Sequence, residues 1–136
     1  MKKISFLIFY TLIVNNLFCQ GIVRKIEFYV IPLSCSFRTS VDYSKVKRLS
    51  TIHIIIKEAN YQIDNDEFLE LIKRVNETKE TEISSDFRIK CVIKKIIGKE
   101  VLYFNKFLDF QYKGKTYRDE NIKKFILNHI PESCKL

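Results

Sequence analysis

Glycine and proline are scarce in this sequence, with 3 and 2 occurrences among 136 residues. Disordered and low-complexity chains are typically enriched in these two residues, so their scarcity argues against that class. No internal repeat and no linker divides the chain. A chain of this length folds as a single domain that can bury a modest hydrophobic core.

Motifs for metal binding and catalysis are missing as well. The sequence has no CxxC or HxxxH motif, and its only histidines are His53 and His129. One acidic group, formed by Asp64, Asp66 and Glu67, is not followed by the glycine and the distal glutamate of a calcium loop. Acidic residues are common at the start of a helix, and this position explains the group. We therefore predict no metal, no cofactor and no catalytic residue. One alternative stays open, because acids distant in the sequence can meet at a shallow hydrolase site.

The first 19 residues have the pattern of an export signal. Two lysines after Met1 precede the uncharged segment Ile4–Val14, and two asparagines follow it. This apolar run is too short for a transmembrane helix, which needs about 20 apolar residues, but it suits a secretory signal peptide. We predict a signal peptide over 1–19 and a single small domain over 20–136, located in the periplasm or secreted.

The end of this leader allows two interpretations. Signal peptidases cut after small residues, which favours Cys19 as the last residue of the leader and Gln20 as the first of the mature chain. The alternative is that Cys19 is acylated and begins a lipoprotein, although Phe18 is larger than the residue usually found before such a cysteine. We expect membrane association only if Cys19 is lipidated.

Three cysteines remain after the leader. Cys91 shares its parity with Ile89 and Ile93 in a strand-like run, which predicts a buried thiol. Cys35 and Cys134 each follow a proline at the end of an element, and export favours oxidation. We predict a Cys35–Cys134 disulfide, and three free thiols are the alternative.

The chain is basic, with 24 Lys and Arg residues against 16 Asp and Glu and a net charge of +8. Loss of the leader removes Lys2 and Lys3, which leaves 22 basic residues and a net charge of +6. Such a surface favours anionic partners such as an acidic protein or an acidic glycan. Nothing in the chain resembles a nucleic-acid-binding module, and export makes nucleic acid an improbable partner.

Hydrophobic periodicity predicts an α+β fold. Alternating residues indicate strands, residues 33–50 form a long loop or an irregular edge hairpin, and apolar stripes at helical spacing indicate two amphipathic helices. The expected order is ββαβββα in a two-layer arrangement, with the helices covering one face of an antiparallel sheet. The expected strands are 22–31, 51–57, 86–97, 100–112 and 115–117, and the expected helices are 64–78, capped by Asp64, and 119–130, capped by Asp119.

Basic and aromatic residues gather in the C-terminal half of the chain. If the even-numbered residues of strand 100–112 are buried, Tyr103 and Phe107 lie on the opposite face, among lysines. An exposed face of this kind suits docking of an acidic protein or glycan. The predicted binding surface comprises Lys94, Tyr103, Lys106, Phe107, Lys113, Lys115 and Arg118. The alternative is that segment 33–50 covers this face and the aromatic residues are ordinary packing.

These observations favour a non-enzymatic binding module outside the cytoplasm, for example an inhibitor or an immunity-type protein. Small size, the export signal, the predicted disulfide and the missing catalytic motifs together support this interpretation. Two alternatives stay open. One is a small structural or lipid-anchored protein of the cell envelope, and the other is a hydrolase with a shallow site.

Overall fold

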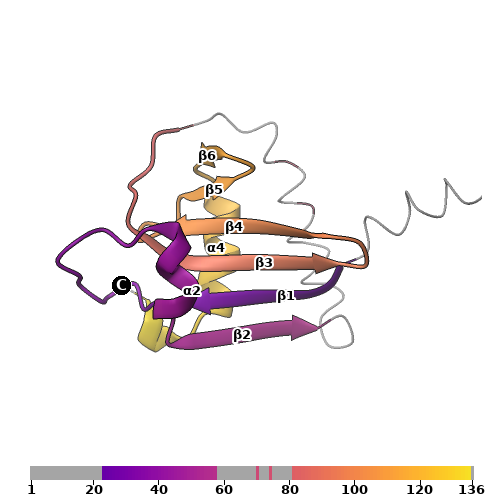
Figure 1. Cartoon of the computed structure of the whole chain (residues 1–136), viewed down its shortest axis with the longest axis horizontal. Helices are drawn as coiled ribbons and strands as arrows, with labels where there is room; N and C mark the ends of the chain where they lie inside the picture. The colour runs from indigo at the N-terminus through magenta and orange to yellow at the C-terminus, as the bar shows by residue number, and fades with distance from the viewer. Residues whose placement is uncertain (1–22, 58–69, 71–73, 75–80, 136) are drawn as a thin grey trace, which may run out of the picture.

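A computed structural model describes residues 23–57, 70, 74 and 81–135 of the chain. Its strands form one sheet in the order β2-β1-β3-β4-β5-β6, and every neighbouring pair is antiparallel (Figure 1). The fold is therefore mostly antiparallel sheet with some helix. The strands are β1 (Val23–Val30), β2 (Ile52–Lys57), β3 (Phe87–Lys95), β4 (Lys99–Asn105), β5 (Phe110–Tyr112) and β6 (Lys115–Tyr117). The helical segments are η1 (Tyr43–Lys45), α2 (Val46–Leu49), α4 (Glu120–His129) and η3 (Glu132–Cys134).

The main hydrophobic core lies between the sheet and α4, which runs behind the sheet in Figure 1. Alternate residues of each strand project to the same face, so one face collects the branched and aromatic side chains. From α4 the core receives Ile122, Phe125 and Ile126. From the three central strands it receives Ile26, Phe28, Val30, Ile89, Cys91, Ile93, Leu102 and Phe104, all with no exposed surface.

Helix α4 begins where the sequence predicts. The carboxylate of Asp119 accepts hydrogen bonds from the backbone amides of Asn121 and Ile122, both at 2.9 Å. These amides have no partner within the helix, so the cap satisfies them. The helix ends at His129, and Pro131 follows shortly afterwards. The prediction of a C-terminal helix capped by Asp119 is therefore confirmed.

The predicted single strand over residues 100–112 is wrong, because a tight turn divides it into β4 and β5. The side-chain oxygen of Asn105 accepts hydrogen bonds from the amides of Phe107 (2.9 Å) and Asp109 (3.0 Å). Leu108 adopts a left-handed conformation with φ of 65° in this turn. The turn directs Leu108 back into the core, so the even-numbered apolar pattern resumes after Lys106 and resembles one strand with a bulge at that residue.

Segment 33–50 contains the short helical turns η1 and α2 in place of the expected loop or edge hairpin. Helix α2 contacts β1 and β3 on the face opposite α4, in front of the sheet in Figure 1. Asp42 caps η1 by accepting a hydrogen bond from the amide of Ser44 at 2.9 Å. A second, smaller apolar cluster lies beneath this segment and consists of Ile31, Val41, Val46 and Phe87.

An ion pair between the buried Arg88 and the half-buried Asp86 fastens this segment to the sheet. Arg88 is 2% exposed, and its Nη2 donates a hydrogen bond to Oδ2 of Asp86 at 2.6 Å. The other oxygen of Asp86 accepts a hydrogen bond from the amide of Val41 at 3.0 Å. Burial alone would raise the pKa of Asp86, but the Arg88 guanidinium and the Val41 amide outweigh it, so the pKa is lowered. Asp86 therefore links residue 41 to the start of β3.

Some predictions concern residues outside the described ranges. The export signal over 1–19, including Cys19, is among them, and so is most of the helix expected over 64–78. In that helix the structure describes Glu70 and Arg74, and both are helical. Within the described ranges no helix combines the length and the apolarity needed to cross a lipid bilayer.

Cys91 is fully buried among core residues, as its position in the strand pattern predicts, and burial raises the pKa of its thiol. Cys35, Cys91 and Cys134 are unbridged thiols in this structure. The fold nevertheless joins the two segments of the predicted disulfide, because the amide of Leu33 donates to the carbonyl of Cys134 at 2.8 Å. The Cys35–Cys134 disulfide stays a prediction.

Candidate binding surface

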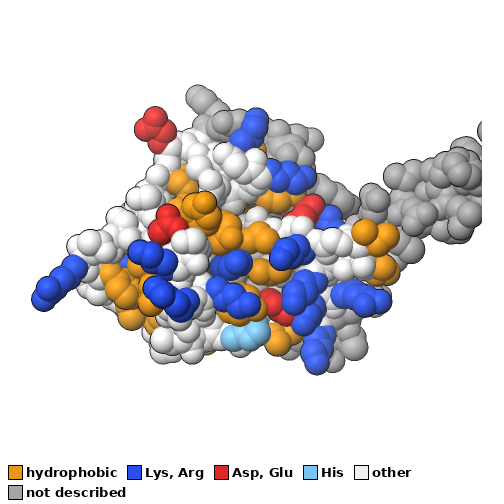
Figure 2. All heavy atoms as spheres, in the orientation of Figure 1, with side chains coloured by type: hydrophobic (Ala, Val, Ile, Leu, Met, Phe, Trp, Pro, Cys, Tyr) orange, Lys and Arg blue, Asp and Glu red, His pale blue; other side chains and the backbone are white. Residues whose placement is uncertain are grey.

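A row of four lysines crosses the sheet on the face opposite α4. In the strand register Lys57 lies beside Lys25, Lys25 beside Lys94, and Lys94 beside Lys99. Paired residues on neighbouring antiparallel strands project to the same face, and like charges in such positions are destabilising. Figure 2 shows the blue side chains gathered over this part of the sheet. Fold stability therefore does not explain the row, which makes it a candidate for binding.

Glu27 lies at the centre of this surface and is 3% exposed. It pairs with the ammonium groups of Lys25 (2.6 Å) and Lys94 (3.1 Å) and accepts a hydrogen bond from the Tyr29 hydroxyl (2.9 Å). Burial alone would raise the pKa of Glu27, but these three donors outweigh it and lower the pKa to about 2. Glu27 is thus ionised at neutral pH and fixes the middle of the lysine row.

Aromatic side chains form a second row beside the lysines. His53, Tyr29, Lys90 and Tyr103 are neighbours in the register of β2, β1, β3 and β4. The rings of His53 and Tyr29 stack with centroids 4.4 Å apart. Lys90 lies over the ring of Tyr103 at 5.5 Å, and Lys47 of α2 lies over Tyr29 at 5.1 Å. These contacts hold two further ammonium groups over the sheet.

A shallow hollow of about 140 Å³ lies between the two rows, with Glu27, Val92 and Val101 among its lining residues. We call the whole surface the lysine face. It carries six lysines against one glutamate, and its members are Lys25, Glu27, Tyr29, Lys47, Lys57, Lys90, Lys94, Lys99 and Tyr103. The uncompensated positive charge suits an anionic partner.

Two of the seven residues of the predicted binding surface, Lys94 and Tyr103, belong to the lysine face. Tyr103 is half-buried, because its ring packs 5.2 Å from Tyr43 and 6.2 Å from Phe87. Segment 33–50 thus covers the Tyr103 end of this face, as the alternative interpretation expects.

The other five residues lie elsewhere. Lys113 and Lys115 flank the turn between β5 and β6. Arg118 makes a bidentate ion pair with Asp109 at 2.8 and 2.9 Å. Lys106 and Phe107 are in the β4–β5 turn and line a cleft that is separate from the lysine face. The structure therefore does not bring the seven residues into one continuous patch.

The predicted binding surface does not include Lys25, Lys57 or Lys47. A signal was present, because Lys25, Glu27 and Tyr29 alternate with the core residues of β1, as His53 and Lys57 do in β2. This alternation does not identify the site unless the order of the strands in the sheet is also known. β1 pairs with β3, although more than fifty residues separate them in the sequence, and that pairing places Lys25 beside Lys94.

The two histidines lie on opposite sides of the sheet, with His53 on the lysine face and His129 on α4. In the part of the chain that the structure describes, no three His, Cys, Asp or Glu side chains cluster as metal ligands. Comparison of the chain with protein-family models, with curated proteins and with solved structures gives no match.

Proposed function

We propose that this protein is an exported, non-enzymatic binding module that recognises an acidic protein or an acidic glycan through the lysine face. The observation that carries the proposal is the row formed by Lys57, Lys25, Lys94 and Lys99 across four strands. Repulsion within the row is only partly offset by Glu27, so a partner that brings further anionic groups is stabilised there. An inhibitor or immunity-type role agrees with this mode of binding.

The surface also suits a macromolecule by its shape. Strands in a sheet lie about 4.8 Å apart, so four lysines on adjacent strands span roughly 14 Å. The hollow between the rows is small, and the half-buried side chain of Tyr29 is among its lining residues. Extended anionic chains and acidic protein surfaces both match a broad, shallow, cationic face.

Binding to two immobilised polyanions tests the proposal. Polyglutamate stands for an acidic protein and polygalacturonate for an acidic glycan. We expect the variant K57Q/K90Q/K99Q to elute at a clearly lower salt concentration than the native chain from at least one of them. These three lysines are not partners of Glu27, so the variant keeps the Glu27 ion pairs.

The matched control is K113Q/K115Q/K124Q, which removes the same charge away from the lysine face. It should elute close to the native chain. Equal shifts for the two triple variants would contradict the proposal, because they would indicate a response to net charge alone. The immobilised polyanion on which the two triple variants differ more in elution identifies the chemical class of the partner.

Export and the finer arrangement of the fold belong to the same proposal. An intact mass of the mature chain that begins at Gln20 would support cleavage after Cys19, whereas a mass with an acyl chain on Cys19 would support lipidation. We also infer a helix over 64–78, which the helical Glu70 and Arg74 support. This helix would be the second of the two helices expected in the two-layer arrangement.

A further inference from the structure

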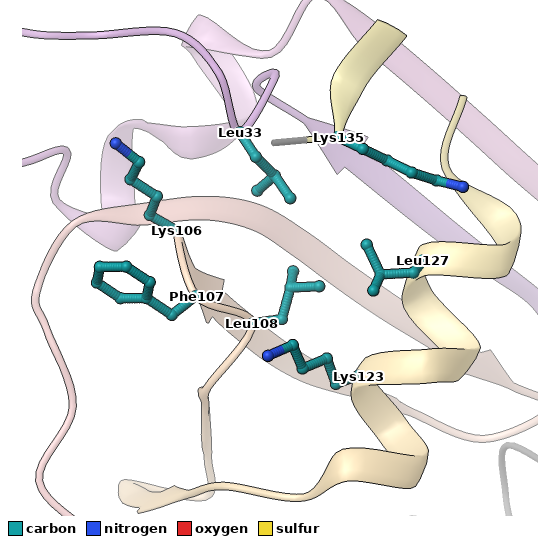
Figure 3. Close-up of a pocket in the computed structure, with 7 residues that line it drawn as sticks. All are labelled: Leu33, Lys106, Phe107, Leu108, Lys123, Leu127 and Lys135. Atoms are coloured by element: carbon teal, nitrogen blue, oxygen red, sulfur yellow. The ribbon is translucent and has the colours of Figure 1, made fainter. Parts of the chain in front are cut away.

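A second concave site lies on the side of the sheet that carries α4. It is a cleft of about 320 Å³ whose lining comes from the β4–β5 turn, from α4 and from the segments that follow β1 and α4. Leu33, Leu108 and Leu127 converge on its centre, and Lys106, Lys123 and Lys135 stand around its border (Figure 3). The cleft therefore combines an apolar interior with a cationic rim.

The cleft has a fixed base and an accessible wall. Leu33 and Leu108 are almost fully buried and form the base. The amide of Leu33 is held by the carbonyl of Cys134, and Asn105 holds the turn that carries Leu108. Phe107 is 56% exposed and stands beside the opening. A ligand can therefore enter without rearrangement of the backbone, which lowers the entropic cost of binding.

Two ammonium groups of the rim are available to a ligand. Lys106 and Lys123 help to lower the pKa of Asp86 and of Asp109, but these two acids already have guanidinium partners, Arg88 at 2.6 Å and Arg118 at 2.8 Å. Lys135 pairs with Glu132. Among the described residues, Lys106 and Lys123 are the rim lysines without such an ion pair.

We propose that this cleft binds a single-chain fatty acid, with its carboxylate between Lys106 and Lys123 and its alkyl chain over the three leucines. The apolar interior excludes a purely polar anion, and the two ammonium groups favour an anionic head group over a neutral one. The volume is at the lower end of the range of small-molecule sites, about 300–1,000 Å³, which suits one alkyl chain of medium length. This site is separate from the lysine face and does not rest on its function.

Calorimetric titration of the purified chain with octanoate, decanoate and dodecanoate tests the proposal below their critical micelle concentrations. We expect one saturable site, with affinity that rises by up to about fourfold for each added methylene that is buried. Amide resonances of Leu108 and Leu127 should shift during the titration, while those of Lys25 and Lys57 on the lysine face should not. No saturable binding, or an affinity independent of chain length, would overturn the proposal.

The charge requirement is tested with K106Q/K123Q and with decanol in place of decanoate. The double variant should bind decanoate about tenfold more weakly, because it loses both exposed ion pairs with the carboxylate. Decanol should bind the native chain and the variant equally. Lys124 is the exposed neighbour of Lys123 on α4 and does not line the cleft, so K124Q should bind decanoate as the native chain does.

Two further outcomes would overturn the proposal. Equal losses in K106Q/K123Q and K124Q would indicate attraction to net charge and not to this cleft. Binding to phosphatidylglycerol vesicles, without any binding of decanoate, would indicate docking of Phe107 and the surrounding lysines on a membrane surface. Failure of the polyanion experiment on the lysine face would leave the fatty-acid titration unaffected, since the two sites share no residue.

Discussion

Glu27 shows how one buried carboxylate organises a cationic surface. Its two lysine partners come from different strands, and its third partner, Tyr29, belongs to the aromatic row. Removing the carboxylate would leave Lys25 and Lys94 facing each other across the β1–β3 pair without compensation. The side chain therefore stabilises both the fold and the arrangement of the lysine face.

The low pKa of Glu27 predicts acid sensitivity. Its pKa is about 2 in the folded protein and 4.5 ordinarily, so the stabilisation is fully present above pH 4.5 and is lost as the pH falls toward 2. The difference corresponds to roughly 3 kcal/mol. We expect Glu27→Gln to lower the free energy of unfolding by about that amount at pH 7 and by much less at pH 2.5, as measured by urea denaturation.

Other carboxylates also titrate in this range, so the comparison needs a matched variant. Glu82 is exposed, and Glu82→Gln should unfold at the same urea concentration as the native chain at both pH values. If Glu27→Gln and the native chain lose equal stability between pH 7 and pH 2.5, the assignment of a low pKa to Glu27 is wrong.

The Asp86–Arg88 ion pair predicts that mutations of its two residues have non-additive effects on stability. Nε and Nη1 of the buried Arg88 have no hydrogen-bond partner among the described residues, and the carboxylate of Asp86 compensates its charge. Asp86→Ala should lower the free energy of unfolding by about 3–5 kcal/mol, because it leaves a buried charge. The double variant D86A/R88M should be less destabilised than D86A alone in thermal unfolding. Losses that simply add would refute this account.

One polar side chain, that of Asn105, holds the β4–β5 turn, and the hydrophobic pattern of the sequence does not reveal this role. Asn105 is fully buried, and it holds a turn in which Leu108 adopts a conformation that few residues other than glycine adopt. The same turn places Phe107 and Leu108 at the proposed fatty-acid cleft. Local backbone geometry thus links a secondary-structure boundary to a candidate ligand site.

We expect Asn105→Ala to lower the free energy of unfolding by about 2–3 kcal/mol, because two amides lose their acceptor. Hydrogen exchange should accelerate most at the amides of Phe107 and Asp109, which donate to Asn105. Asn128 is an exposed asparagine of α4, and Asn128→Ala should change stability by less than about 0.5 kcal/mol. Unchanged exchange at the two amides would contradict the role of Asn105.

At the scale of the whole molecule, the C-terminal segment lies beside the segment that follows β1. The hydrogen bond from Leu33 to Cys134 joins the segment after β1 to η3 at the C-terminus. The segment from 81 onward is held at the other edge of the sheet, because the amide of Thr81 donates to the carbonyl of Thr116 at 2.9 Å. Long-range contacts of this kind determine which distant cysteines are candidates for pairing.

The predicted Cys35–Cys134 disulfide would close a loop of about 100 residues, which corresponds to roughly 4–5 kcal/mol in the chain-entropy model. We expect non-reducing peptide mapping of the purified protein to find these two cysteines linked and Cys91 as a thiol. The reductant dithiothreitol should then lower the unfolding temperature. A mapping experiment that finds Cys134 unpaired would disprove the bridge.

Local sequence patterns were sufficient for much of the fold. The strands that became β1, β2, β3 and β6, the buried Cys91 and the Asp119 cap of α4 all follow from residues close together in the chain. Alternation and capping are local effects, so they are visible in a single sequence. The division of 100–112 was missed, because a turn closed by an asparagine side chain left the apolar parity the same on both sides of a single break at Lys106.

Composition and periodicity alone determined that this protein is a basic α+β domain and which residues of each strand face the core. Only the tertiary structure decided which charged side chains lie beside one another. The register of β2, β1, β3 and β4 assembles Lys57, Lys25, Lys94 and Lys99 into one row, and the β4–β5 turn separates Lys106 and Phe107 from them. The physical reason is that burial patterns depend on neighbours along the chain, whereas a surface depends on strand pairing between distant segments.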